Sequence, residues 1–174
     1  AKPNSGHNAI SKLNKIGKVY KVITQNIDNL HQDSGIARER VIELHGNTSF
    51  AKCLDCNSRF ELEEIRQQFE SCQRERAPRC SKCNGFVKTA TISFGQPMPD
   101  TEMKLAETAS LDSDLFIAIG SSLKVFPAAG FPILAKRNGA KLIIINREAT
   151  ELDSIADLVL NADITASLSG LMDS

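Results

Sequence analysis

The sequence predicts an α/β fold in which a parallel sheet carries a small insert. Strand-like apolar runs alternate with helical segments towards both ends of the chain, which is typical of βαβ crossovers. From about residue 49 to residue 95 this alternation stops, and two Cys-x-x-Cys pairs occur there. Hydrophobic residues make up 41% of the 174 positions, enough to bury a core. We therefore expect a sheet domain at 1–48 and 96–174, interrupted by a separate module at 49–95.

The N-terminal elements are predicted from local patterns. A helix follows Pro3, a residue type that favours helix starts, and apolar residues recur along it at helical spacing. The β-branched run at 19–24 predicts a strand, and a polar loop follows it at 25–28. A second, short strand is expected at 41–44.

The C-terminal part continues the alternation. The expected elements are a helix at about 100–109, a strand at 115–119, a helix at about 128–137, strands at 141–145 and 158–160, and a closing helix. Polar or glycine-bearing loops follow Thr24, Ile119 and Ile145. Because ligands in open α/β sheets bind outside the carboxyl ends of the strands, we expect the site at these three loops.

The insert carries a strong metal-binding pattern. Cys53 and Cys56 form one pair, and Cys80 and Cys83 form the second. Two such pairs complete a tetrahedron of thiolates around Zn²⁺ and leave no position open for water, so the ion should be structural. Unligated or disulfide-bonded cysteines are the alternative interpretation. Metal-bound cysteines favour a reducing compartment, and we expect a cytoplasmic protein.

Between the two pairs, apolar residues at helical spacing predict a helix at about 62–72, and a strand is expected at 86–94. Cys72 lies on the apolar stripe of this helix. We therefore interpret Cys72 as a small buried hydrophobic residue rather than as a ligand or nucleophile.

The charge balance argues against two classes of partner. The chain has 21 Lys and Arg against 21 Asp and Glu, so its net charge is zero, and a neutral surface attracts phosphate backbones and anionic membranes weakly. No apolar run reaches the about 18 residues of a membrane helix. Arginines near the cysteines alternate with glutamates, as on a solvated face. We expect no membrane association and no direct sequence-specific binding of nucleic acid. The sequence does not indicate which oligomeric state the protein adopts.

His45 is the best catalytic candidate among three histidines. It ends a short strand and precedes Gly46, which permits a sharp turn towards a cleft. Imidazoles ordinarily titrate near neutral pH and suit proton transfer, although a structural histidine explains the position equally well. Polar residues in the three loops could hold a carboxamide, ribose or phosphate, or could merely cap the loops. These residues are Asn26, Asp28, Gly120, Ser121, Ser122 and Asn146.

Taken in order, these motifs resemble the sirtuin family of NAD-dependent protein deacylases. The matching stretches are Pro3-Asn4-x-x-His7, Thr24-Gln25-Asn26-Ile27-Asp28-Asn29-Leu30-His31, Glu43-Leu44-His45-Gly46, the four paired cysteines, Phe94-Gly95, Gly120-Ser121-Ser122-Leu123-x-Val125-Phe126-Pro127-Ala128-Ala129 and Asn146. The family's opening Gly-Ala-Gly segment has no counterpart here. The sequence therefore resembles a bacterial-type sirtuin lacking that N-terminal segment.

The resemblance implies a Rossmann-like NAD-binding domain, a structural zinc module and removal of acyl groups from protein lysines. The family reaction releases nicotinamide and O-acyl-ADP-ribose. His45 matches the family's general base, which acts on a ribose hydroxyl. The matching cofactor-binding residues are Gln25 and Asn26 at the nicotinamide ribose, Ile27 and Asp28 at the carboxamide, and Gly120, Ser121, Ser122 and Asn146 along the adenosine half of NAD. The matching substrate-binding residues, at the acyl-lysine tunnel and the peptide-binding backbone, are Ile92, Phe94, Gly95 and Val125.

Two positions depart from the family pattern. Gln96 follows Phe-Gly where the family usually has Glu, and Lys88-Thr89 replaces the usual Arg-Pro. Three other functions remain open at this stage: mono-ADP-ribosyl transfer, a noncatalytic zinc-stabilised interaction module and, disfavoured by the neutral charge, a zinc protein that binds nucleic acid.

Overall fold

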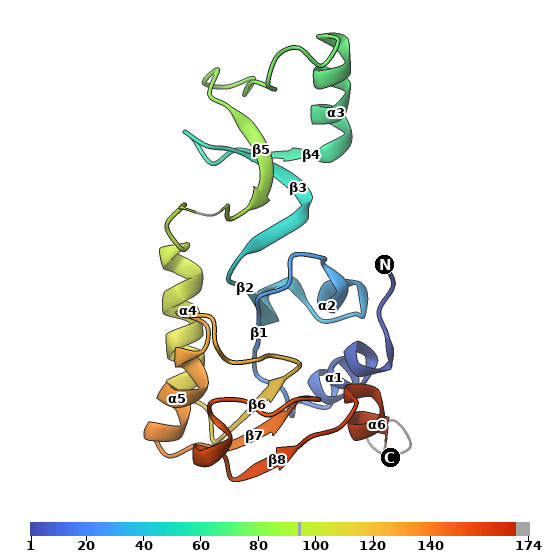
Figure 1. Cartoon of the computed structure of the whole chain (residues 1–174). Helices are drawn as coiled ribbons and strands as arrows, with labels where there is room; N and C mark the ends of the chain where they lie inside the picture. Colours follow the sequence, from blue (N-terminus) through green and yellow to red (C-terminus); the bar gives the residue numbers. More distant parts are fainter. Residues whose placement is uncertain (94, 170–174) are drawn as a thin grey trace. The chain divides into compact units, whose positions relative to one another are not determined.

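The chain folds as two units in the computed structural model, which describes residues 1–93 and 95–169 (Figure 1). The first unit comprises residues 1–23, 30–44 and the chain from Pro99 onward, and the second comprises 24–29 and 45–98. Phe94, an expected substrate-binding residue, lies outside the described residues. The domain limits expected at 49 and 95 stay a prediction.

A parallel sheet forms the centre of the first unit. Its strands β6 (Leu115–Ile119), β7 (Lys141–Ile145) and β8 (Leu158–Leu160) pair in the order β6-β7-β8 (Figure 1). These ranges confirm the predicted strands. Because Ile119 stands opposite Ile145, the carboxyl ends of β6 and β7 are level.

Five helices accompany this sheet in the described part of the first unit. They are α1 (Ser5–Lys15), α2 (Leu30–Asp33), α4 (Asp100–Leu111), α5 (Gly130–Arg137) and α6 (Ile164–Ser169), with 3₁₀ turns at Arg38–Arg40 and Asp153–Ile155. Successive residues of a strand point to opposite faces of its sheet. Ile144 packs with Leu142 on one face, whereas Ile145 packs with Ala9 of α1 and Leu168 of α6. The sheet is thus covered by apolar side chains on both faces, as parallel sheets require.

The N-terminal strand is shorter than the sequence predicts. β1 spans Val22–Thr24 and pairs with β2 (Val41–Glu43), whereas the expected strand began at Val19. The reason lies at the end of α1, where the Asn14 side-chain amide donates to the Val19 carbonyl over 2.9 Å. This contact ties the start of the expected strand to the helix.

The second unit contains an antiparallel sheet and one helix. β4 (Arg59–Glu61), β3 (Gly46–Cys53) and β5 (Val87–Thr91) pair in that order, and α3 spans Leu62–Ser71 (Figure 1). The core on one side of this sheet consists of Ala51, Cys53, Phe60, Cys80 and Val87, with Ile65 of α3 packed against it.

The expectation that Cys72 is buried is wrong. The helix ends at Ser71, and Cys72 lies exposed just beyond it. Within α3, Ile65 packs against the small core, whereas Cys72 follows the last residue of the helix. In the described part of the chain, none of the helices combines the length and the hydropathy that a membrane crossing requires.

Asp157 joins three segments of the first unit. Its carboxylate accepts hydrogen bonds from the Lys136 ammonium (2.5 Å), the Leu142 backbone amide (2.8 Å) and the Lys141 ammonium (3.1 Å). These donors, Lys136 foremost, hold the pKa of Asp157 well below its usual range. A depressed carboxyl pKa stabilises the fold above the unfolded value of about 3.9, and that stabilisation is lost as the pH falls.

We predict that Asp157→Asn lowers the unfolding temperature at neutral pH by removing this charge. The difference from the wild type should shrink steadily below about pH 4, where the unfolded carboxyl binds its proton. Thermal unfolding followed by circular dichroism between pH 7 and pH 3 measures this, with the exposed Glu151→Gln as the matched control. An undiminished difference at low pH would contradict the assignment.

Candidate active site and metal centre

His45 is held in one orientation by the backbone of the loop that follows β1. Its Nδ1 lies 3.0 Å from the carbonyl oxygen of Gln25. Because a carbonyl only accepts hydrogen bonds, Nδ1 carries the proton of the neutral ring, and Nε2 carries the lone pair. The His45 carbonyl in turn accepts from the Ile92 amide over 2.9 Å. A fixed imidazole with a basic Nε2 is the arrangement that general-base chemistry requires.

Gly46 makes the chain turn directly after His45. Its φ is +76°, and a Cβ at this position would lie 1.9 Å from the Ala90 carbonyl oxygen. Any other residue would therefore push β3 away from β5 at the point where β3 begins. The glycine allows the two strands to approach closely beside His45.

Four hydrogen bonds order the loop after β1, and three of them join it to β3 next to His45. The Thr24 hydroxyl accepts from the Asn26 amide (3.0 Å), and the Ile27 carbonyl accepts from the amide (2.8 Å) and the hydroxyl (2.7 Å) of Thr48. The fourth joins the Asn47 amide group to the Asn29 side-chain oxygen (2.9 Å). The second unit thus brings His45 together with the expected cofactor-binding residues Gln25, Asn26, Ile27 and Asp28.

Asn47 is a positioning residue that the sequence patterns did not indicate. Its side chain is fully buried, and its oxygen also accepts from the Ser49 amide over 2.7 Å. A buried polar group must find such partners, so Asn47 fixes the loop through Asn29. One feature of the sequence could have indicated Asn47. It is a polar residue directly after His45-Gly46, at the start of an otherwise strand-like run.

The expected substrate-binding residues divide between the units. Ile92 lies beside His45 through its backbone hydrogen bond, and Gly95 adopts a φ of +83°. Val125 belongs to the first unit and is 55% exposed.

The remaining expected cofactor-binding residues lie at the carboxyl ends of β6 and β7. The Gly120 amide donates to the Ile145 carbonyl over 2.9 Å, which places Gly120 next to the residue before Asn146. The Ser121 hydroxyl accepts from the Leu123 amide, and the Asn146 side chain donates to the Glu148 carbonyl. Gly120, Ser121, Ser122 and Asn146 therefore share the edge of the parallel sheet at which ligands bind in this fold class.

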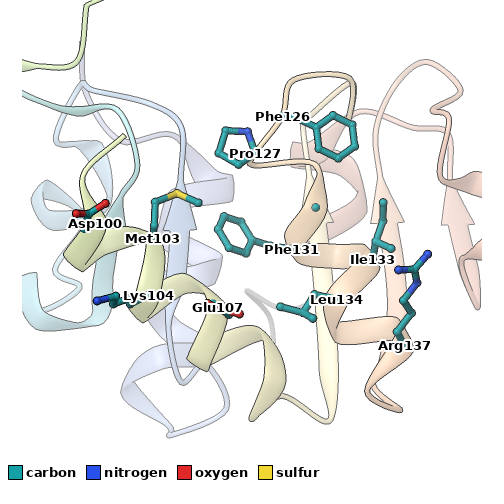
Figure 2. A pocket seen from close by; sticks show the side chains of 11 residues that line it. Asp100, Met103, Lys104, Glu107, Phe126, Pro127, Phe131, Ile133, Leu134 and Arg137 are labelled. Carbon is teal, nitrogen blue, oxygen red and sulfur yellow. The ribbon is translucent and has the colours of Figure 1, made fainter. Parts of the chain in front are cut away.

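A separate apolar groove of about 700 Å³ lies between α4 and α5 (Figure 2). Figure 2 shows the Phe131 ring of α5 directed towards α4, where Met103 also lines the groove. None of the expected site residues lines this groove.

The four paired cysteines converge as predicted. Their sulfur atoms all lie within 4.8 Å of one another, with Cys53 and Cys83 3.4 Å apart and Cys56 and Cys80 3.6 Å apart. Zn–S bonds of about 2.3 Å place the sulfurs of a tetrahedron about 3.8 Å apart, so the geometry fits a structural Zn²⁺. The Ser58 hydroxyl and backbone amide lower the pKa of Cys56 to about 6.

A model of the Sir2 family matches residues 1–127 of this chain. The NAD-dependent protein deacetylase 1 of Bradyrhizobium diazoefficiens is 57% identical over 168 residues, which cover 97% of this chain and 65% of the relative. The NAD-dependent protein deacetylase of Rhodopseudomonas palustris is 56% identical over 168 residues, 97% of this chain and 66% of the relative. The chain thus spans about two thirds of the length of these relatives.

Solved structures agree with these sequence matches. A structure of Sir2Tm bound to a propionylated peptide has a TM-score of 0.88 at 38% identity, covering 99% of this chain and 71% of that one. A structure of Sir2 bound to acetylated peptide has a TM-score of 0.89 at 37% identity, with the same coverage of 99% and 71%.

We predict that Gly46→Ala destabilises the protein by more than the about 1 kcal/mol expected for a positive φ alone, because the added Cβ meets the Ala90 carbonyl. Gly17→Ala is the matched control, since Gly17 has a φ of +75° and open space around the added carbon. Urea unfolding measures both losses. Equal losses would show that the Ala90 carbonyl places no constraint on residue 46.

We predict that the purified chain binds one zinc ion and that Cys53→Ser loses both the ion and the structure of the second unit. The buried Cys53 sulfur is a member of the four-sulfur cluster, and metal binding supplies folding energy to small modules. Cys72→Ser removes an exposed thiol outside the cluster and should retain the ion. Elemental analysis with circular dichroism measures both. Folded wild-type protein without zinc would refute the site.

Proposed function

This chain belongs to the Sir2 family, and from this membership we propose that it carries out NAD-dependent removal of acyl groups from protein lysines. The observation that carries the proposal is the hydrogen bond between His45 Nδ1 and the Gln25 carbonyl, which leaves Nε2 as a proton acceptor beside the loop 24–29. The relatives named NAD-dependent protein deacetylase and the neighbours solved with acylated peptides support this choice.

The chemistry of the side chains around His45 fits NAD as co-substrate. Amide and carboxylate groups of Gln25, Asn26 and Asp28 can hydrogen-bond a ribose and a carboxamide, which are the groups of the nicotinamide half. In the proposed reaction, NAD supplies a ribose carbon that the acyl oxygen of the modified lysine attacks as nicotinamide leaves. We assign the adenosine half to Gly120, Ser121, Ser122 and Asn146 at the ends of β6 and β7.

His45 then performs the proton transfer of the proposed reaction. Its Nε2 takes the proton of a ribose hydroxyl, and the Gln25 carbonyl accepts from Nδ1–H both before and after this transfer. Ile92, Phe94, Gly95 and Val125 are proposed to bind the acyl-lysine peptide. One water is consumed as the lysine amine is released, and the products are the deacylated peptide, nicotinamide and O-acyl-ADP-ribose. The thiol cluster supports a reducing compartment, and we propose the cytoplasm.

The test is incubation of the chain with NAD and an acetyl-lysine peptide, followed by measurement of free nicotinamide and peptide mass. Deacetylated peptide together with nicotinamide supports the proposal. Nicotinamide release with a heavier protein acceptor and an unchanged peptide would instead establish ADP-ribosyl transfer.

We predict that His45→Ala lowers deacetylation about 10²- to 10⁴-fold, because removal of a general base has this effect. Zinc content and unfolding temperature are measured alongside, to show that the variant retains its fold. A correctly folded His45→Ala variant with wild-type turnover would remove His45 from the mechanism.

A further inference from the structure

Lys88 has an unusually complete set of hydrogen bonds for a lysine in an edge strand. Its ammonium donates to the Thr91 carbonyl over 2.8 Å, to the Ser93 hydroxyl over 2.7 Å and to the Gln96 side-chain oxygen over 2.8 Å. An ammonium has three N–H donors, so all three are used. Thr91 is the last residue of β5, and Ser93 and Gln96 lie in the segment that follows it along the chain.

Gln96 uses the same oxygen to close a turn. Its side-chain oxygen also accepts from the Ser93 amide over 2.8 Å, and the Gln96 amide donates to the Ser93 carbonyl over 3.0 Å. Ser93 and Gln96 are both exposed. Exposed residues have little packing to hold them in place. These polar contacts and the Lys88 ammonium therefore fix the positions of Ser93 and Gln96.

The turn closed by Ser93 and Gln96 begins directly after Ile92. The Ile92 amide donates to the carbonyl of His45, and the residue before it, Thr91, gives its carbonyl to Lys88. One ammonium therefore holds both the strand end that contacts His45 and the turn that follows it.

We propose that Lys88 is a positioning residue for acyl-lysine peptide binding, because it holds Thr91, Ser93 and Gln96, which flank the proposed peptide-binding residues Ile92 and Gly95. This inference rests on the proposed function, which assigns peptide binding to the same segment. A preordered segment binds its ligand without the loss of conformational entropy that a disordered one suffers on binding. Removal of the ammonium should therefore weaken peptide binding more than it slows proton transfer at His45.

Lys52 offers a matched control on the neighbouring strand. It stands directly opposite Lys88 in the pairing of β3 with β5, it is exposed, and its ammonium lies 5.8 Å from the centre of the Phe50 ring. Lys52→Met removes the same charge and the same number of donors from the same row of the sheet. It leaves the contacts of the turn closed by Ser93 and Gln96 intact.

The experiment measures the Kd of the full chain for a fluorescein-labelled acetyl-lysine peptide by fluorescence anisotropy. Lys88→Met should weaken binding at least about tenfold, because Thr91, Ser93 and Gln96 must then be ordered when the peptide binds, and Gln96→Met should act in the same direction. Lys52→Met should bind as the wild type does. The double variant Lys88→Arg/Gln96→Glu, which replaces the contact by a charged pair, should recover most of the affinity.

Steady-state kinetics provide the second readout. Lys88→Met should raise KM for the peptide while kcat changes little, whereas general misfolding would lower kcat and zinc content together. Wild-type affinity in Lys88→Met, an equal loss in Lys52→Met or no recovery in the double variant would overturn the inference. A wild-type chain that binds no acetylated peptide would overturn the proposed function and the inference with it.

Discussion

The hydrogen bond from His45 Nδ1 to the Gln25 carbonyl is the contact on which the site of the second unit depends. It joins two stretches far apart in the sequence, and the bonds of Thr48 to Ile27 and of Asn47 to Asn29 continue the same junction. Gly46 makes the junction possible, because β3 can begin beside β5 only where residue 46 lacks a Cβ. The orientation of one imidazole thus depends on the Gln25 carbonyl, on the contacts that hold its loop and on the turn at Gly46.

β3 also connects this junction to the metal centre. The strand begins at Gly46, directly after His45, and ends at Cys53, whose buried sulfur belongs to the four-cysteine cluster. β5 pairs with β3 at both ends of the strand, with a register shift between Gly46 and Ala51, and β4 pairs with it at residues 50–52. We infer that a metal bound at Cys53 stabilises the C-terminal end of β3. The first residue of this strand, Gly46, makes the turn after His45. The zinc module is then a support for the site as well as an independent core.

Much of this could be predicted because its signals are local. The strands at 115–119 and 141–145 and the cysteine cluster were predictable, since apolar runs and knuckle spacing are properties of short segments. Asn47 and Lys88 were not identified as positioning residues, because their roles depend on partners that only strand pairing and turn geometry bring near. The burial of Cys72 was predicted wrongly for a related reason: periodicity shows a helix stripe but not where the opposing core ends.

The chemical identity of the group that orients His45 has a consequence for the proposed reaction. A carboxylate partner at Nδ1 would fix the tautomer and would also favour the protonated ring through its charge. The Gln25 carbonyl fixes the same tautomer as a neutral dipole and brings no full charge. General-base chemistry at His45 requires the lone pair on Nε2, and the neutral carbonyl provides the tautomer that places it there. The Gln25 carbonyl is in place because the loop 24–29 is pinned to β3. This neutral partner thus suits a histidine that accepts a proton rather than donates one.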